Sequence, residues 1–353
     1  MNLYPPELRE TLSPVVALVG DASTQQLLKQ MRASWPKLPR TDALGEWERI
    51  DPRFADLAAA PPHRRAREGE HAAERPPRST GGDILKDGWW RKHALLVPAA
   101  AALLAPWRDD TPWQPIAEAL VVARAQLRPG CKVLLVLVLD GPRAVEPQIG
   151  GDERLAQLMR AAALEPKGIL SLRLQGATSE AGRASIQRLD RALVEAADGY
   201  YREQAKRARR MRELAIRPSS LAVRYELKAA FHAHIRRDGA TAERHYSAAY
   251  GLLVELARLR FGTVQAVGAA QQPAPAASLV PPSISGASMA GIKEAAETTA
   301  LQLVRLLLLA GRAAEAARAG RGTLVSSRLS RVTNFALSTL HEDRRGGRVT
   351  GRG

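Results

Sequence analysis

The run at residues 132–140, KVLLVLVLD, constrains the fold of this chain more than any other stretch. Every residue between its lysine and its aspartate is apolar. A strand with one face in water alternates apolar and polar residues, whereas a strand that is covered on both faces is apolar throughout. We therefore predict an interior strand over 132–139, in a sheet that has helices on both of its faces.

The segments around this run alternate between strand and helix patterns. Further strands are predicted over 14–20, 46–51, 95–104 and 168–174, and helices over 22–33, 112–127 and 152–164. Because strands and helices that alternate at this spacing need crossover connections, the sheet should be mostly parallel. We expect the strand at 132–139 to lie next to 98–104 or 169–174.

From Ser179 onward the sequence favours helices. The first of them is long, and its apolar residues recur at steps of three or four on one face: Leu189, Leu193, Ala197, Tyr200 and Tyr201. The segment Arg217-Pro218-Ser219-Ser220 ends this helix, because a residue before proline leaves the helical conformation and the serines can cap the next helix. A last pair of helices over 291–320 should turn at Ala310-Gly311-Arg312.

A helix pair that turns at Asp238-Gly239 follows the long helix. Its first helix should bury Leu221, Tyr225, Ala229, Ala230 and Phe231, and its second Ala242, Tyr246, Ala249, Leu253, Leu256 and Leu259. Four of these positions have the small, small, aromatic, small spacing of a tetratricopeptide helix pair: Ala230, Ala242, Tyr246 and Ala249. The tryptophan, the Leu-Gly and the proline of that repeat are missing, so two packed antiparallel helices are better supported than a repeat array.

These patterns divide the chain into an α/β domain over 1–178 and a region of helical hairpins over 179–320. The first contains a disordered insertion at 52–82, which is rich in Pro, Arg, Glu and Ala and lacks apolar periodicity. The second, of α-solenoid or tetratricopeptide-like type, contains a Gly- and Pro-rich linker at 262–290. Residues 321–353, rich in Arg, Gly and Ser, should form a disordered tail.

The sequence lacks the motifs of common nucleotide-binding and hydrolytic sites. It has no Gly-Lys dipeptide for a P-loop, no G-x-G-x-x-G and no G-x-S-x-G. We interpret His232, His234 and His245 as surface or half-buried histidines, and Cys131 as a buried structural thiol. We therefore expect a protein that is not an enzyme and that needs no cofactor and no metal ion.

The compartment is indicated by the cysteine count and the N-terminus. One cysteine excludes an internal disulfide and fits a reducing compartment. The first residues, MNLYPPELRETLSP, are polar and proline-rich where a signal peptide needs an apolar run. The longest apolar run, 94–106, is shorter than the roughly 20 residues that a spanning helix needs. We expect a soluble cytosolic protein.

The net charge of +16 permits nucleic acid, an anionic membrane or an acidic protein surface as a partner. Part of this charge forms a stripe on the long helix, made of Arg202, Lys206, Arg209 and Arg210. A solvated helix face is the simplest interpretation of such a stripe, and we prefer it. The stripe is also the candidate interaction face of the chain, should it bind a partner.

Three stretches carry a family resemblance. The first is Tyr4-Pro5-Pro6-Glu7-Leu8 followed by Pro14-Val15-Val16-Ala17-Leu18-Val19-Gly20. The second and most specific is Ile84-Leu85-Lys86-x-Gly88-Trp89-x-x-Lys92-His93, followed by Leu96-Val97-Pro98-Ala99. The third runs from Tyr200-Tyr201 to Tyr246-x-x-Ala249-Tyr250-x-Leu252-x-Val254-Glu255-Leu256. Across residues 4–320 the chain thereby resembles the Foie gras family, the N-terminal portion of subunit 11 of the trafficking protein particle (TRAPP) tethering complex.

The resemblance implies an α/β region followed by an α-solenoid, and the role of a scaffold subunit in vesicle transport from the endoplasmic reticulum to the Golgi. The implied partners are other TRAPP subunits and, indirectly, a Rab-family GTPase, with no small-molecule substrate. The implied location is cytoplasmic and peripheral to the Golgi and intermediate membranes, where the stripe would contact anionic lipid. The competing hypothesis, based on the charge, is a basic helical nucleic-acid-binding protein.

We interpret the residues of the second stretch as mainly structural: Leu85, Lys86, Gly88, Trp89, Lys92 and His93. Glycine permits a tight turn at Gly88, and the ring of Trp89 should plug the edge of the sheet. The alternative is that Lys92 and His93 contact a neighbouring subunit.

Overall fold

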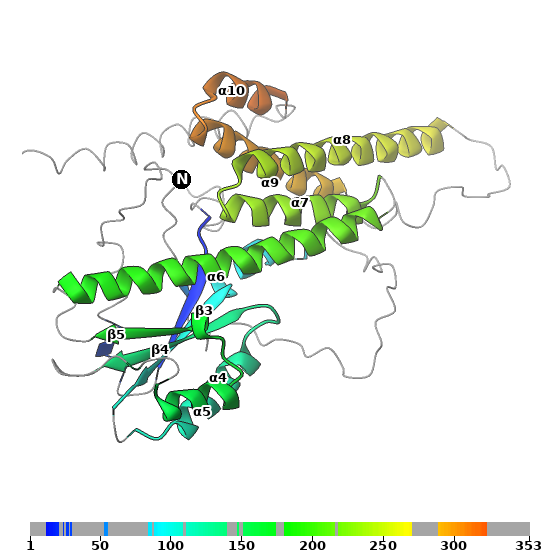
Figure 1. Ribbon diagram of the computed structural model, residues 1–353. Coiled ribbons are helices and arrows are strands. Elements are labelled where there is room, and N and C mark those ends of the chain that lie inside the picture. The colour runs from blue at the N-terminus through cyan, green and yellow to red at the C-terminus, as the bar shows by residue number, and fades with distance from the viewer. Residues whose placement is uncertain are drawn as a thin grey trace, which may run out of the picture. The chain divides into compact units, whose positions relative to one another are not determined.

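A computed structural model describes residues 12–20, 24, 26, 27, 29, 53–55, 84–86, 88–108, 111–139, 147, 151–173, 180–215, 218–269 and 289–322 (Figure 1). These residues fall into two compact units. The first lies within 1–70 and 90–203, and the second within 71–89 and 204–353. The predictions for 46–51, for most of 22–33 and 52–82, and for 323–353 lie outside the described residues.

The first unit holds a sheet of five parallel strands in the order β2-β1-β3-β4-β5. The strands are β1 (Val15–Gly20), β2 (Arg53–Ala55), β3 (Ala100–Pro106), β4 (Lys132–Leu139) and β5 (Ile169–Arg173). The apolar run forms β4, and β3 and β5 flank it, as Leu135 pairs with both Leu103 and Ile169. The predicted parallel sheet and the predicted neighbours of 132–139 are therefore confirmed.

Two predictions that bear on the sheet need correction. The apolar run at 95–104 was expected to be one strand, but Lys92–Leu96 is a π-helical turn and β3 begins only at Ala100. Pro98 separates the two because it has no N–H to give to a ladder. β2 lies in the segment expected to be a disordered insertion, and its three residues are too short to give an apolar pattern.

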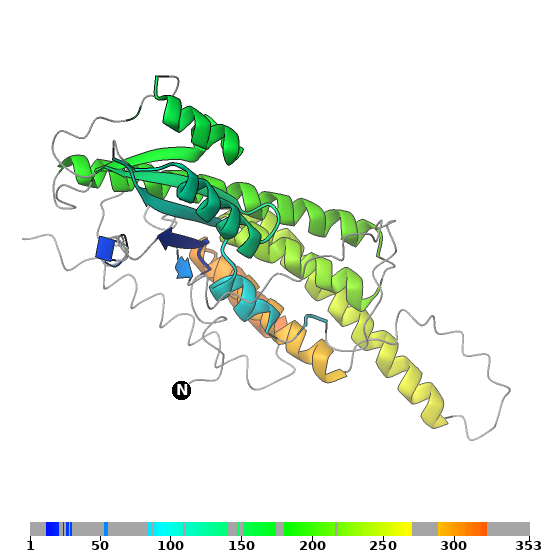
Figure 2. The ribbon, with the colours of Figure 1, turned by 90° about the horizontal axis from the view of Figure 1, so that it is seen from below.

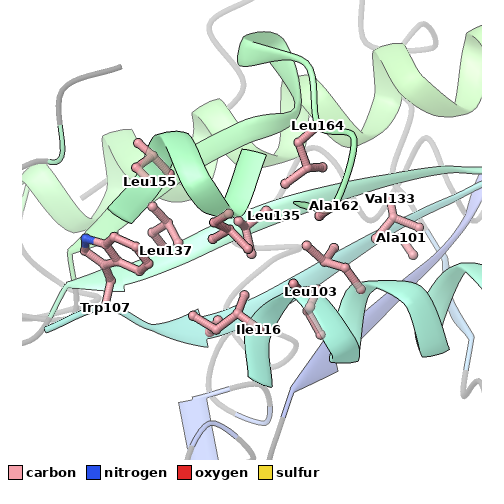
Figure 3. Packing of buried hydrophobic residues seen from close by; sticks show 14 of the residues in the cluster. Ala101, Leu103, Trp107, Ile116, Val133, Leu135, Leu137, Leu155, Ala162 and Leu164 are labelled. Carbon is pink, nitrogen blue, oxygen red and sulfur yellow. The ribbon is translucent and has the colours of Figure 1, made fainter. Parts of the chain in front are cut away.

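Each face of the sheet is covered by helices. On one face, alternate residues of β3 and β4 pack against α4 (Gln114–Gln126) and α5 (Glu153–Ala161), as Figure 3 shows. The first part of α6 (Glu180–Glu213) lies on the other face (Figure 1). There the first N–H group of β1, that of Val15, donates to the hydroxyl of Tyr201 over 3.2 Å. The expected apolar face of α6 is buried at Leu189, Leu193, Ala197, Tyr200 and Tyr201.

The second unit holds helices that pack in chain order. They are α7 (Ser220–Ile235), α8 (Gly239–Ala269), α9 (Met289–Leu309) and α10 (Ala313–Gly322). Each packs against the next one along the chain, and Figure 2 shows α7, α8 and α9 side by side. The last pair turns at 310–312 with Gly311 at φ +74°, as predicted, because glycine adopts this conformation without strain.

Both helices of the α7–α8 pair have a side-chain cap at the start, and the serine cap of α7 was predicted. The Ser219 hydroxyl accepts from Ala222 N–H at the start of α7, and Asp238 accepts from Thr241 N–H at the start of α8. The left-handed residue of the turn is Arg237, at φ 62°, and not Gly239. α8 also extends to Ala269, into the expected linker, because no proline interrupts the sequence before Pro273.

Some burial predictions for this pair are wrong. Leu221 and Tyr225 are only half-buried, and Leu259 is 43% exposed. Instead, α7 buries Val223, Glu226, Leu227, His232, Ala233, His234 and Ile235 in addition to the predicted alanines and Phe231. The cause is that α7 is covered by α8 and is also contacted by Ile84 and Trp89, so its burial follows no single stripe.

Candidate interaction surfaces

Residues 84–86, Gly88 and Trp89 form a strap on α7. A tight turn precedes Trp89, whose N–H donates to the Lys86 carbonyl over 3.0 Å. Gly88 makes this turn at φ +66°, a conformation that glycine adopts without strain. Farther along, the Arg224 guanidinium of α7 donates through Nε to the Ile84 carbonyl over 2.6 Å.

The indole of Trp89 lies against α7, and the role at the edge of the sheet that the sequence analysis proposed stays a prediction. Its ring meets that of Phe231 edge to face, with 5.0 Å between the centroids. The Lys228 ammonium lies 5.8 Å from the Trp89 centroid and 5.3 Å from that of Tyr225. These distances are in the range of cation–π attraction. Trp89 is therefore the apolar anchor of the strap.

The other residues of this stretch differ in exposure. Lys86 is exposed, and Leu85, Lys92 and His93 are half-buried. Lys92 begins the π-helical turn, whose last hydrogen bond joins Val97 N–H to the Lys92 carbonyl over 2.9 Å. The mainly structural role proposed for this stretch stays a prediction, as does contact of Lys92 and His93 with a subunit.

We expect Trp89→Ala to lower the free energy of unfolding by roughly 2 kcal/mol, about half the cost of truncating a fully buried tryptophan, because the ring is half-buried. Urea unfolding of the full chain, followed by circular dichroism, measures this. Lys86→Ala is the control and should change the stability by less than about 0.5 kcal/mol. Equal effects of the two substitutions would show that the indole does not anchor the strap.

The four residues of the predicted stripe are not equivalent. Arg202, Lys206 and Arg210 are exposed, and Arg209 is half-buried. Arg202 is paired, with Nη2 at 2.6 Å from the Asp198 carboxylate. Arg207, which the sequence analysis did not select, is exposed as well. Whether the stripe binds a partner stays a prediction.

A buried polar cluster in the second unit connects α7 and α8 to the C-terminal end of α6, which belongs to this unit from residue 204 on. The Glu226 carboxylate of α7 accepts from Arg212 Nη1 of α6 over 3.2 Å, and its other oxygen lies 2.7 Å from His245 Nδ1 of α8. Burial alone would raise the pKa of Glu226, but the hydrogen bond with His245 and the electrostatic attraction of the groups around it, Arg212 among them, outweigh burial and hold the pKa below its usual value. The carboxylate is thus ionised, and His245 Nδ1 donates to it.

The sequence analysis missed this cluster and placed the histidines wrongly. His232, His234 and His245 are each only 4% exposed, not surface or half-buried. Burial, and then the positive charge of Lys228, lowers the pKa of His232 to about 3. Burial, and then the charges of Arg305 and Arg237, lowers that of His234 to about 3. The signal in the sequence was Glu226 itself, an acidic residue on a helix otherwise rich in buried apolar residues.

We expect the helices of the second unit to lose stability as the pH falls from 7 to 5. The unfolded chain takes up protons on His232 and His234 below a pKa of about 6.5, whereas the folded chain keeps both neutral down to about pH 3. The loss at pH 5 is about 2 kcal/mol per histidine. The free energy of unfolding, measured with urea, should therefore differ between pH 7 and pH 5 by about 2 kcal/mol less in His234→Gln than in the natural chain. An unchanged difference would contradict a neutral buried His234.

The carboxyl ends of the strands are where ligands bind in parallel sheets of this type, near the point where the strand order reverses. In the described part of that edge, Trp107 is buried under the Arg154 guanidinium, which lies 4.8 Å from the ring centroid. Arg154 also donates to the carbonyls of Arg108 and Thr111. The Arg154 side chain is thus engaged by the Trp107 ring and by two backbone carbonyls. The absence of enzymatic activity stays a prediction.

Further observations bear on the chemistry of the chain. Cys131 is half-buried, and burial raises the pKa of its thiol to about 12, so it is a poor nucleophile. Nowhere in the described residues do three His, Cys, Asp or Glu side chains come together as a metal site would need. In the same part of the chain, no helix has the length and apolar character to cross a membrane.

Comparison with characterised proteins finds similarity to one trafficking subunit. The chain is 28% identical over 183 residues to trafficking protein particle complex subunit 11 of Homo sapiens and of Bos taurus. Each match covers 49% of this chain and 16% of the relative, and the subunit of Gallus gallus matches to the same extent. No family model matches the chain. Half of the chain is thus similar to a small part of a much longer protein.

Proposed function

We propose that this protein is a scaffold subunit of a TRAPP-type vesicle-tethering complex that acts in transport from the endoplasmic reticulum to the Golgi. The observation that carries the proposal is the similarity to TRAPP complex subunit 11 over 183 residues. The Foie gras assignment made from the three stretches is part of the same proposal. In this assignment the chain acts through binding and is not an enzyme.

The architecture of the second unit supports a scaffold role. Helices α7 to α10 pack in chain order, each against the next, as helices do in α-solenoids. Such stacks present a long surface to partners while each helix pair needs only its neighbours for stability. We propose that α7 to α10 are the beginning of a solenoid.

The proposed partners are the other subunits of the complex and, through them, a Rab-family GTPase. The proposed location is cytoplasmic, peripheral to the Golgi and the ER–Golgi intermediate membranes. Contact with anionic lipid through the basic stripe belongs to this proposal, because four cations near a membrane contribute about 1 kcal/mol each.

The net charge of +16 favours a second candidate, a basic nucleic-acid-binding protein. Single-stranded nucleic acid usually stacks on exposed aromatic rings beside the basic residues. The two aromatic residues of α6, Tyr200 and Tyr201, are both buried. The stripe therefore offers phosphate contacts only, and this candidate ranks second.

Affinity purification of the tagged full chain from its own cells, with mass spectrometry of the co-purifying proteins, tests the proposal. We expect several TRAPP subunits in amounts close to that of the chain, and their persistence after nuclease treatment. Recovery of nucleic acid together with ribonucleoproteins, and of no tethering subunit, would favour the second candidate instead.

A further inference from the structure

The outer side of the C-terminal end of α6 carries cations that the fold does not use. Arg212 binds the buried Glu226, and Arg202 binds Asp198 one turn earlier on its own helix. The guanidinium groups of Arg207 and Arg210 make no hydrogen bond or ion pair with another described residue, and both side chains are exposed. These two arginines are therefore available to an acidic group outside the chain.

An exposed leucine lies beside them. Leu214 is 53% exposed, and its N–H still donates to the Arg210 carbonyl over 3.3 Å, so it continues the helical path. Positions 207, 210 and 214 are spaced by three and four residues and share one side of the helix. With the exposed Lys206, one turn before Arg210, they form a surface that we call the α6 ridge: Lys206, Arg207, Arg210 and Leu214.

The helix dipole explains only part of this ridge. Cations stabilise a helix when they lie in its last turn, near the free carbonyl groups. α6 ends at Glu213, which places Arg210 within that turn and Lys206 and Arg207 before it. The negative charge of Glu213, at the end of the helix, interacts unfavourably with the helix dipole. The exposed Arg207 and the exposed Leu214 therefore need another explanation.

We propose that the α6 ridge is a docking surface for an acidic protein surface that offers carboxylates to Arg207 and Arg210 and an apolar site to Leu214. This inference deepens the proposed function and rests on it for the source of the partner, another subunit of the complex. Arginine suits carboxylates because its planar guanidinium binds both oxygens at once.

An anionic membrane fits the ridge less well. The inner side of this part of α6 is buried within the protein at Ala205 and Ala208, so the helix has no apolar face to insert among lipids. Headgroup attraction alone would contribute about fivefold per cation, or roughly 100-fold for three, which is weak binding. Neither a lipid headgroup nor a nucleic-acid phosphate makes use of Leu214.

The test uses the full chain with Arg207→Glu/Arg210→Glu, and Arg188→Glu/Arg191→Glu as its matched control. The control pair is exposed, lies on the same helix and has the same spacing. We expect the amount of the subunit that co-purifies with the first variant to be about one tenth, or less, of the amount that co-purifies with the control. This change is equivalent to roughly 1.4 kcal/mol of binding free energy. Leu214→Ala should retain about threefold less, because burial of part of its side chain is lost.

A cross-link from position 207 or 210 should fall beside Asp or Glu residues of that subunit. Replacing those residues by Arg should restore binding to the Arg207→Glu/Arg210→Glu variant. Phosphatidylserine vesicles and a mixed-sequence DNA duplex at physiological salt should bind the natural chain and the control equally weakly.

The outcomes separate the ridge from the proposed function. If Arg207→Glu/Arg210→Glu lost a partner that is not a TRAPP subunit, the α6 ridge would be supported as a docking surface and the proposed function would be overturned. Retention of TRAPP subunits by Arg207→Glu/Arg210→Glu at the control level would keep the function and overturn the ridge. Tight binding to vesicles or duplex that this variant abolishes would also overturn the ridge, and co-purification of nothing would overturn both.

Discussion

Tyr246→Ala is expected to destabilise the helical unit by about 3–5 kcal/mol, the cost of removing a large, fully buried side chain from a packed core. The ring of Tyr246 is 0% exposed in the α7–α8 interface, where it meets the ring of His234 edge to face with 6.1 Å between centroids. Its helix neighbours Ala242 and Ala249, and Ala230 on α7, are also 0% exposed. The small residues cannot close the cavity that the substitution would leave.

Two substitutions on the same helix serve as controls for Tyr246→Ala. Tyr246→Phe keeps the ring and should remain within about 1 kcal/mol of the natural chain. Tyr250→Ala, one turn away at a half-buried position, should cost less than half as much as Tyr246→Ala. Urea unfolding of the full chain measures all three variants. A Tyr246→Ala protein that unfolds with the natural midpoint would show that α7 and α8 do not pack around this ring.

Glu226→Ala is expected to lower the free energy of unfolding by about 3 kcal/mol. The Glu226 side chain is 2% exposed and is bound to Arg212, which is 23% exposed, and to His245, which is 5% exposed. Removing one partner of a buried ion pair leaves the other charge in the interior without compensation. The partial exposure of Arg212 places the expected loss at the lower end of the range for buried pairs.

Glu213 provides the matched control for Glu226→Ala. Its carboxylate lies 3.8 Å from the same guanidinium, but the side chain is 66% exposed. Glu213→Ala should therefore change the stability by less than about 0.5 kcal/mol. Glu226→Gln keeps the volume and loses the charge, and should lie between the two. If Glu226→Ala and Glu213→Ala were equally mild, the three-helix cluster would not stabilise the fold.

The sheet could be predicted because its strands carry the pattern that their environment imposes. β4 is covered on both faces, so all but one of its residues are apolar and buried, as an interior strand requires. β2 could not be predicted, because a strand of three residues is too short to show an alternation of apolar and polar residues. The start of β3 was misplaced since an apolar run does not distinguish a buried helical turn from a strand.

The candidate surfaces were predicted less well, for a physical reason. Charge stripes follow from helical spacing alone, so most of the basic surface of α6 was found. The burial of His232, His234 and Glu226 depends on which elements cover α7, and spacing along one helix cannot give that. The same holds for Trp89, whose partner Phe231 is more than 100 residues away in the sequence.

The central claim is that this chain works by binding proteins through its helices and not by chemistry at its sheet. Hydrogen–deuterium exchange of the full chain, free and within the assembly purified from its cells, tests this most directly. We predict slower exchange on assembly along 204–215 and α7 to α10, and unchanged exchange at 105–108 and 137–139, where β3 and β4 end. Protection confined to those strand ends, or no difference between the free and the assembled chain, would contradict the account.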